Sequence, residues 1–253
     1  MIIKLVSYNS WARLSVKERE LRISTAATIL NNEDSDFVMF SEWIFNKKED
    51  LDTVCKLVYN KKVTALFELK LGRKALVRNH LYLLQNGEVI DLETHQIFSD
   101  SSRATEDNIR LLVDELELHR QFVVQDKTFL IIQCGENNIL KTQKDEKNNA
   151  EFRLSNKDLK KRFEGCLSNA DIILNPTHSK WLRFYDFTCR LSKFSEKNRF
   201  CFYCTQLEDN MLENALKHPE KNTTQRAMNS RRIMKPIYTD SNNHDYLLQA
   251  YEI

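Results

Sequence analysis

Apolar and polar residues follow two alternating patterns along the chain. Short apolar runs rich in β-branched and aromatic residues predict buried strands, and longer segments with apolar residues three or four positions apart predict helices. The predicted strands cover residues 2–8, 37–40, 63–69, 128–132, 171–174 and 200–205. The predicted helices cover residues 16–31, 51–59, 107–120 and 158–167. Strands that alternate with helices need crossover connections, so the pattern predicts the α/β class.

A hairpin is the clearest local feature. The apolar run at residues 75–84 is followed by Asn86 and Gly87, and Val89 and Ile90 begin the next run. An Asn-Gly pair supplies the two positive φ angles of a type I′ turn, which joins antiparallel strands. The sequence therefore predicts two antiparallel strands on either side of Asn86 and Gly87.

Two polar stretches interrupt the pattern. Residues 141–151 predict a surface loop, and residues 207–235 predict loops or a mobile excursion before a tail at residues 245–253. A chain of 253 residues that is 42% hydrophobic can bury a large core, and an α/β sandwich of this size is commonly one domain. We therefore expect a single domain over residues 1–253, in which residues 207–253 form the C-terminal excursion and tail.

Composition argues against several classes of protein. Lys and Arg number 38 against 36 Asp and Glu, a balance too even to indicate a polyanionic partner such as nucleic acid. Four glycines do not suffice for a glycine-rich phosphate loop. The first residues lack the apolar region of a signal peptide, and no run approaches the ~18 apolar residues of a membrane span. We therefore expect a cytoplasmic protein that does not bind a membrane.

The six cysteines are too sparse for a disulfide scaffold in a chain of this kind, so we expect reduced thiols. Cys201 and Cys204 have the spacing of half a zinc site, but a second pair is missing and their segment has the pattern of a buried strand. A core role is favoured, and a redox or metal-binding protein is the weaker alternative. No metal site is predicted.

Polar groups that could carry chemistry follow three of the apolar strands: Glu42, Cys134, and the stretch that contains Asn175 and His178. In open α/β sheets, sites gather at the carboxyl ends of strands, so these three ends are candidates for one cleft. A thiol at a strand-to-helix turn is exposed and close to N–H groups that favour the thiolate, and a nearby glutamate can take its proton. Each residue also has a plainer role. A cysteine after an apolar strand is most often structural, and a glutamate there is usually a helix cap.

Taken in order, segments between residues 2 and 206 resemble the nitrilase, or carbon–nitrogen hydrolase, superfamily. The resemblance rests on Val38-Met39-Phe40-Ser41-Glu42, on the hairpin at residues 79–90, on Ile131-Ile132-Gln133-Cys134-Gly135-Glu136, and above all on residues 169–181. It implies a four-layer αββα sandwich with two mixed β-sheets, and a homodimer paired across one helical layer. It also implies a Glu-Lys-Cys triad that acts on amides, nitriles or carbamoyl groups without a metal or an organic cofactor.

The resemblance also implies roles for particular residues. Glu42 is the general base, and Cys134 is the nucleophile whose thiolate attacks the carbonyl carbon of a small-molecule substrate. The N–H of Gly135 helps to hold the oxyanion, an amine or ammonia leaves, and water hydrolyses the thioester. The other substrate-binding candidates are side chains that could line a small-ligand pocket: Trp43, Glu136, Asn175, His178 and Trp181.

The catalytic lysine of the family has no counterpart in this sequence. Residues 92–98 occupy its place, His95 aligns best, and there is no lysine between Lys74 and Lys127. A lysine is a permanent cation, whereas histidine has a reference pKa of ~6.5. Losing one oxyanion donor costs a factor of ~100 to 1,000 in rate. His95 as a working replacement and His95 in an inactive site are therefore both open.

Two hypotheses follow from this departure. The first is an amidase-type hydrolase that cleaves a carbon–nitrogen bond through Cys134, and the second is a non-catalytic relative that binds a small ligand or a protein. Lys70 or Lys74 could supply a cation from the preceding connection. Glu106 could be the second glutamate that the family often carries, although a place at a helix start is its plainer role.

Overall fold

The computed structural model describes residues 1–8, 15–45, 47–70, 79–143, 149–177, 184–207, 224–241 and 246–253. The chain divides into two compact units. Unit 1 comprises Met1–His95, Cys204–Gln225 and Lys235–Ile253, and unit 2 comprises Gln96–Tyr203 and Arg226–Met234. No helix among these residues is long and apolar enough to cross a membrane.

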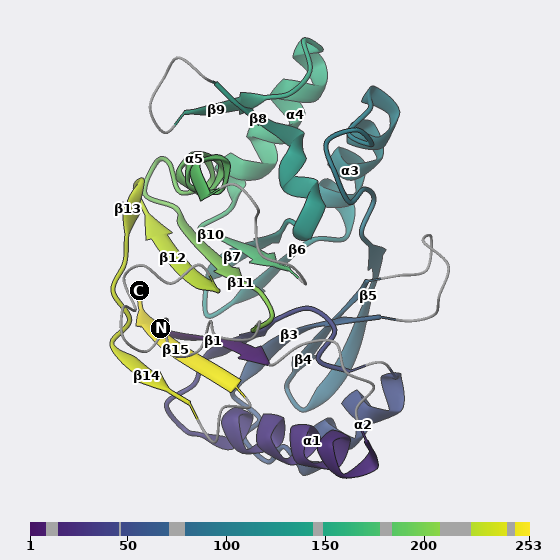
Figure 1. The fold of residues 1–253 in the computed structure, drawn as a ribbon, viewed down its shortest axis with the longest axis vertical. Coiled ribbons are helices and arrows are strands. Elements are labelled where there is room, and N and C mark those ends of the chain that lie inside the picture. Colours follow the sequence, from purple (N-terminus) through teal and green to yellow (C-terminus); the bar gives the residue numbers. More distant parts are fainter. Residues whose placement is uncertain are drawn as a thin grey trace. The chain divides into compact units, whose positions relative to one another are not determined.

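The sheet of unit 1 has seven strands in the order β14-β15-β1-β2-β3-β4-β5 (Figure 1). Three neighbouring strands run parallel: β1 (Ile2–Tyr8), β2 (Phe37–Phe40) and β3 (Thr64–Leu69). The remaining strands pair antiparallel with their neighbours: β4 (His80–Gln85), β5 (Glu88–His95), β14 (Tyr238–Asp240) and β15 (Tyr246–Glu252). The sheet is therefore mixed.

Helices α1 (Val16–Asn31) and α2 (Lys48–Leu57) cover one face of this sheet (Figure 1). α1 begins at a capping box, in which the side chains of Ser15 and Glu18 each accept a hydrogen bond from the other residue's backbone N–H. Alternate strand residues point to opposite faces, so every second strand residue packs against the helices. The core on this face includes Ala26, Leu30, Leu51, Val54, Phe40, Phe67, Leu69, Tyr82 and Leu84.

The hairpin of β4 and β5 forms as predicted. Asn86 and Gly87 have φ angles of 55° and 80°, the positive values of the expected turn. The ladder continues to the pair His80 and His95, with an irregularity between His80 and Tyr82. β5 lies at one edge of the sheet and β14 at the other, so His95 lies at the end of an edge strand.

The sheet of unit 2 has the strand order β13-β12-β11-β10-β7-β6. Its strands are β6 (Gln121–Val124), β7 (Lys127–Ile131), β10 (Ile172–Pro176), β11 (Phe200–Cys204), β12 (Gln225–Asn229) and β13 (Arg232–Ile233). β7 is parallel to β10 and antiparallel to β6, so this sheet is mixed too. Three helices supply apolar side chains to its core: α3 (Glu106–Leu118), α4 (Lys157–Asn169) and α5 (Phe184–Phe194).

Two expectations about polar stretches were wrong. The predicted loop at residues 141–151 begins and ends in a two-stranded ladder of β8 (Leu140–Thr142) and β9 (Ala150–Phe152). Only alternate residues of so short a hairpin need be apolar, and here Leu140, Ala150 and Phe152 are buried.

The other wrong expectation concerns the loops or mobile excursion predicted at residues 207–235, of which residues 208–223 lie outside the described residues. The excursion contains β12 and β13, and the tail forms β15, which pairs with β1 inside the first sheet. β12 is polar in sequence but buried. Gln225 Nε2 donates to the carbonyl of Leu247 at 2.8 Å, and the Arg226 guanidinium lies 5.5 Å from the Phe187 ring centroid.

Candidate functional site

Glu42 lies in the turn that follows β2, and its side chain is fully buried. Two hydrogen bonds to the backbone of the turn hold it within unit 1. Gln206 Nε2 donates to the carbonyl oxygen of Glu42 at 2.9 Å, and the N–H of Trp43 donates to the carbonyl oxygen of Glu68 at 2.9 Å. Glu68 is a second fully buried carboxylate beside this turn, and the sequence interpretation missed it.

Trp43 has a φ of 60°, in the left-handed region that bulky residues rarely occupy. Its indole Nε1 donates to Asn79 Oδ1 at 2.5 Å, and Lys70 Nζ lies 4.2 Å from the ring centroid. Lys70 is therefore in a cation–π contact with Trp43, the residue that follows Glu42 in the sequence. Lys74 lies outside the described residues. Backbone strain of this kind is found where a structure holds a side chain for function, which makes Trp43 a site candidate.

His95 lies on the helix-covered face of the first sheet. Its ladder partner is His80, whose partner on the other side is Leu69, a member of the core under α1 and α2. Ladder partners share a face, and successive residues alternate, so fully buried Thr94 points to the opposite face. The rings of His80 and His95 are stacked with centroids 6.0 Å apart. Burial lowers the pKa of His80, Asp91 opposes this, and His95 adds to it.

Cys134 begins a 3₁₀ helix, η2 (Cys134–Ile139), three residues after β7 ends. The predicted position of the thiol just past a strand end is therefore where the structure has it. The sequence interpretation expected an exposed thiol, and this was wrong, because Cys134 is only 8% exposed. Gly135 packs directly on another backbone segment. A Cβ atom at Gly135 would lie 2.0 Å from the carbonyl oxygen of Ser99, so no larger residue fits there without a backbone shift.

Side chains hold the backbone on both sides of Cys134. They bond to four backbone groups: Glu136 Oε2 accepts from Gln133 N (3.0 Å), Asn175 Nδ2 donates to Ile132 O (2.5 Å), Asn137 Nδ2 donates to Cys134 O (2.9 Å), and Asn138 Nδ2 donates to Gly135 O (2.7 Å). Such local side-chain bonds replace the ladder that ends with β7. The turn around Cys134 is therefore fixed by side chains in addition to the backbone bonds of η2.

Glu136 was predicted to bind substrate, but its carboxylate is engaged inside the protein. Arg120 Nη1 donates to Oε2 at 2.5 Å and Arg120 Nη2 to Oε1 at 3.1 Å, and both side chains are fully buried. The N–H of Ile97 donates to Oε1 at 2.7 Å. With the bond from Gln133, two donors reach each oxygen, the usual way a buried charge is satisfied. The sequence interpretation missed Arg120, which nothing distinguishes among 38 basic residues.

Asn175 is the predicted site residue that the structure brings next to Cys134. It is fully buried in β10, which is parallel to β7, and Asn137 Nδ2 joins its Oδ1 at 2.7 Å while also holding the carbonyl of Cys134. The ends of β7 and β10 thus share a sheet edge, as parallel neighbours do. β2, whose end carries Glu42, belongs to the other sheet. The three strand ends that the sequence proposed for one cleft are therefore divided between the two sheets.

Of three other predicted site residues, one lies at the start of α3 and two lie outside the described residues. Glu106 is the first residue of α3, after the N-cap Thr105, and its half-exposed carboxylate bonds to Arg110 (3.3 Å) and Asn156 (2.8 Å). This is the plainer role that the sequence allowed. His178 and Trp181 fall outside the described residues.

The thiols at Cys201 and Cys204 belong to the interior, as the favoured interpretation had it. Both residues are fully buried in β11, and burial raises the pKa of each thiol, that of Cys204 to about 12. Burial raises the pKa of Cys166 to about 11. Within the described ranges, no three His, Cys, Asp or Glu side chains are grouped so that they could hold a metal ion.

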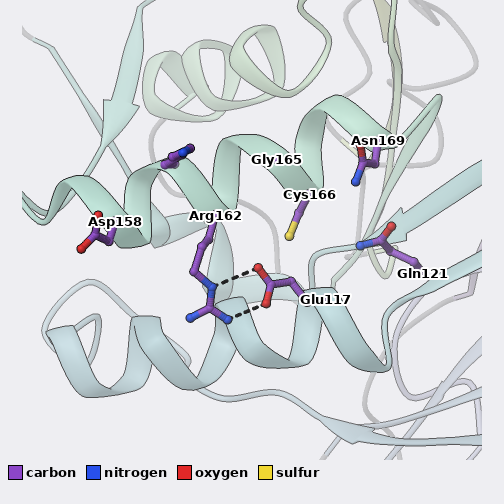
Figure 2. Close-up of a pocket in the computed structure, with 8 residues that line it drawn as sticks. Glu117, Gln121, Asp158, Arg162, Gly165, Cys166 and Asn169 are labelled. Carbon is purple, nitrogen blue, oxygen red and sulfur yellow. Dashed lines mark hydrogen bonds and ion pairs between the residues drawn. The ribbon is translucent and has the colours of Figure 1, made fainter.

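A groove of about 510 Å³ lies between α3 and α4, away from the predicted site residues (Figure 2). Figure 2 shows Arg162 of α4 clamped by Glu117 of α3, and Asp114 accepts from Arg162 as well, at 2.6 Å. These opposite charges satisfy one another on a half-exposed surface. The groove contains none of the residues predicted to act in chemistry.

Comparison with known proteins defines the fold. No protein-family model and no curated protein matches the sequence. Among solved structures, an amidase from Nesterenkonia sp. has a TM-score of 0.54 at 8% identity, over 99% of this chain and 90% of that chain. A carbon–nitrogen hydrolase from Helicobacter pylori G27 has a TM-score of 0.57 at 8% identity, over 99% and 88%.

A third structural neighbour is larger. It is a glutamine-dependent NAD(+) synthetase from Cytophaga hutchinsonii, with a TM-score of 0.57 at 10% identity, and the match covers 99% of this chain but 42% of that one. Another neighbour is described as an amidase from the nitrilase superfamily. The chain therefore has the fold of the carbon–nitrogen hydrolase superfamily, with two large mixed sheets, as the resemblance in sequence implied.

Proposed function

We propose that this protein hydrolyses a carbon–nitrogen bond in a small amide, with Cys134 as nucleophile and Glu42 as general base. The observation that supports this most is the turn around Cys134, where four side-chain bonds hold the backbone beside a residue that is 8% exposed. A reacting group held in one geometry is what nucleophilic catalysis needs. Neighbours with this fold include mutants of an amidase in complex with butyramide and with acrylamide.

The proposed reaction has two steps. Glu42 takes the thiol proton, the Cys134 sulfur bonds to the carbonyl carbon, the C–N bond breaks, and the protonated Glu42 gives its proton to the departing amine. Water then attacks the thioester, which releases a carboxylic acid and restores the thiol. Gly135 N–H is the proposed donor to the oxyanion in both steps.

Ammonia release from butyramide and acrylamide tests the proposal. Cys134→Ala should abolish release by the purified protein while the far-ultraviolet circular dichroism spectrum stays unchanged, and Cys55→Ala is the matched control that should keep full turnover. Unchanged release by Cys134→Ala would reject the assigned nucleophile. Glu42→Gln should also lose turnover but keep a thiol that an alkylating reagent can reach.

The second candidate function is a binding protein with this fold and no turnover. The observation that favours it is the orientation of His95, whose ring is stacked on His80 on the face covered by α1 and α2. In this second candidate function, His95 does not take the place of the family's lysine. Calorimetric titration with the same two amides separates the candidates. Binding without ammonia release would support the binding protein, and release would support the hydrolase.

A further inference from the structure

The Arg120–Glu136 ion pair is a buried feature that the proposed reaction does not use. Both side chains are fully buried, and the guanidinium donates two hydrogen bonds to the carboxylate. Removing two charges from water costs free energy that their attraction barely returns, and well-packed apolar residues often stabilise a core as well or better. Stability alone is therefore a weak reason for this pair.

The pair joins three segments of unit 2 that are distant in sequence. Arg120 lies between α3 and β6, and its carbonyl accepts from the N–H of Ile131 at 3.0 Å, next to the end of β7. Glu136 lies in η2, two residues after Cys134. The third segment contains Ile97, whose N–H donates to Glu136, and Ser99, whose backbone packs on Gly135. All three segments meet at the turn that carries the thiol.

The carboxylate also fixes the turn from inside. Glu136 Oε2 accepts both from Arg120 and from the N–H of Gln133, the residue before Cys134. A rotation of the Glu136 side chain would therefore release Gln133 and change the backbone direction at Cys134. Arg120 prevents this rotation, because its planar two-pronged donor group matches both carboxylate oxygens at once.

We propose that Arg120 and Glu136 are positioning residues that set the orientation and the reactivity of the Cys134 thiol. This inference rests on the proposed function, in which Cys134 is the nucleophile. Neither residue touches the substrate. They act through the backbone on either side of Cys134. Active sites commonly need such supporting residues to hold a reacting side chain in one geometry.

The experiment follows alkylation of individual cysteines by iodoacetamide across pH, with each site quantified by mass spectrometry. The variants are Glu136→Gln, Arg120→Lys and the double variant Arg120→Met/Glu136→Leu, and urea unfolding is measured for each. The rate at Cys134 should fall by ~10- to 100-fold in the Glu136→Gln and double variants, the order of loss that a misplaced reacting group causes. Cys55, in unit 1, is the internal reference and should keep its rate.

The double variant separates positioning from stability. Its urea midpoint should be higher than that of Glu136→Gln and close to that of the unaltered protein, because the apolar pair leaves no charge buried alone. If the pair positions the thiol, the Cys134 rate stays low although the protein is stable, and Arg120→Lys gives an intermediate rate because it keeps the charge and loses the fork. A Cys134 rate that recovers with stability overturns the proposal. A double variant that fails to fold overturns it too, since the charges would then serve the fold itself.

A matched control and the unaltered protein complete the design. Arg162→Met/Glu117→Leu removes a half-exposed ion pair of the same unit and should leave the rate at Cys134 unchanged. If Cys134 of the unaltered protein reacts no faster than Cys55, the proposed function fails. If Cys134 is fast in the unaltered protein and equally fast in the Glu136 and Arg120 variants, only the positioning role fails.

Discussion

The turn at Cys134 and the end of β5 at His95 are two of the places where the sequence predicted catalytic groups, and the structure holds them very differently. The backbone around Cys134 is bonded by buried side chains from Glu136, Asn137 and Asn175. His95 ends an edge strand, partly exposed, with a stacked ring as its neighbour. The difference teaches that a network of buried hydrogen-bonding side chains marks a position where geometry is controlled, which a residue type alone does not.

The largest expected effect breaks the network at Cys134. Glu136→Leu leaves the Arg120 guanidinium buried without its partner, so the free energy of unfolding should fall by about 3–5 kcal/mol. Urea denaturation measures this fall. Glu117→Leu removes the carboxylate of a half-exposed pair and should cost about 0–1 kcal/mol. Equal losses in the two variants would show that the buried pair is no more important than a surface pair.

The next effect concerns the backbone contact at Gly135. Gly135→Ala forces a Cβ atom against the Ser99 carbonyl and should cost about 1–3 kcal/mol through displaced backbone. Gly165 in α4 is the matched control, since a Cβ atom there meets nothing within 4 Å. Gly165→Ala should therefore stabilise by about 0.5–1 kcal/mol. Thermal unfolding of both variants tests the pair, and a Gly135→Ala protein as stable as Gly165→Ala would contradict the close contact.

A smaller effect is expected at the end of β5. His95→Lys puts a flexible ammonium group on the face covered by α1 and α2, so ammonia release should change by much less than the ~100- to 1,000-fold that an oxyanion donor contributes. Ammonia release from butyramide measures it. A rise of that full size would mean that the side chain at 95 reaches the reacting carbonyl and that the hydrolase has lost its cation.

The smallest expected effect is the pH dependence of the free energy of unfolding that His80, the neighbour of His95, contributes. Burial lowers the pKa of His80, so the unfolded chain binds more protons than the folded chain as pH falls below ~6.5. The free energy of unfolding should therefore fall as pH drops through that range, by well under ~1 kcal/mol for a half-buried ring screened by solvent. His80→Gln should flatten this dependence in urea denaturation. The same slope in His80→Gln would assign it to other groups.

Much of the fold could be predicted because its core strands are continuous apolar runs in the sequence. The strand at Ile2–Tyr8, the helix at Val16–Asn31 and the turn at Asn86 and Gly87 follow directly from periodicity and turn chemistry. β12 could not be predicted, because Gln225 and Arg226 are buried only through partners distant in the sequence. Apolar patterns do not reveal a strand that is buried by hydrogen bonds.

Only part of the candidate site could be predicted, because some of its residues depend on partners that are distant in the sequence. Cys134 and Asn175 stand at strand ends, so their place in a shared sheet edge was predictable. Arg120 and Asn137 act through pairings across long sequence separations, and no spacing rule identifies them. The face of a strand to which His95 points depends on the register and the irregularity of β5, which the sequence alone does not fix.

The bonds around Cys134 also have a consequence for the time at which the thiol becomes competent during synthesis. Glu136 needs Ile97 and Arg120, which are made before it, but the carbonyl of Ile132 needs Asn175, which is made some forty residues later. Chains emerge from the ribosome N-terminus first. A nascent chain that stops before β10 therefore carries Cys134 in an unfinished turn, and the bonds that hold its backbone are complete only when β10 has been made.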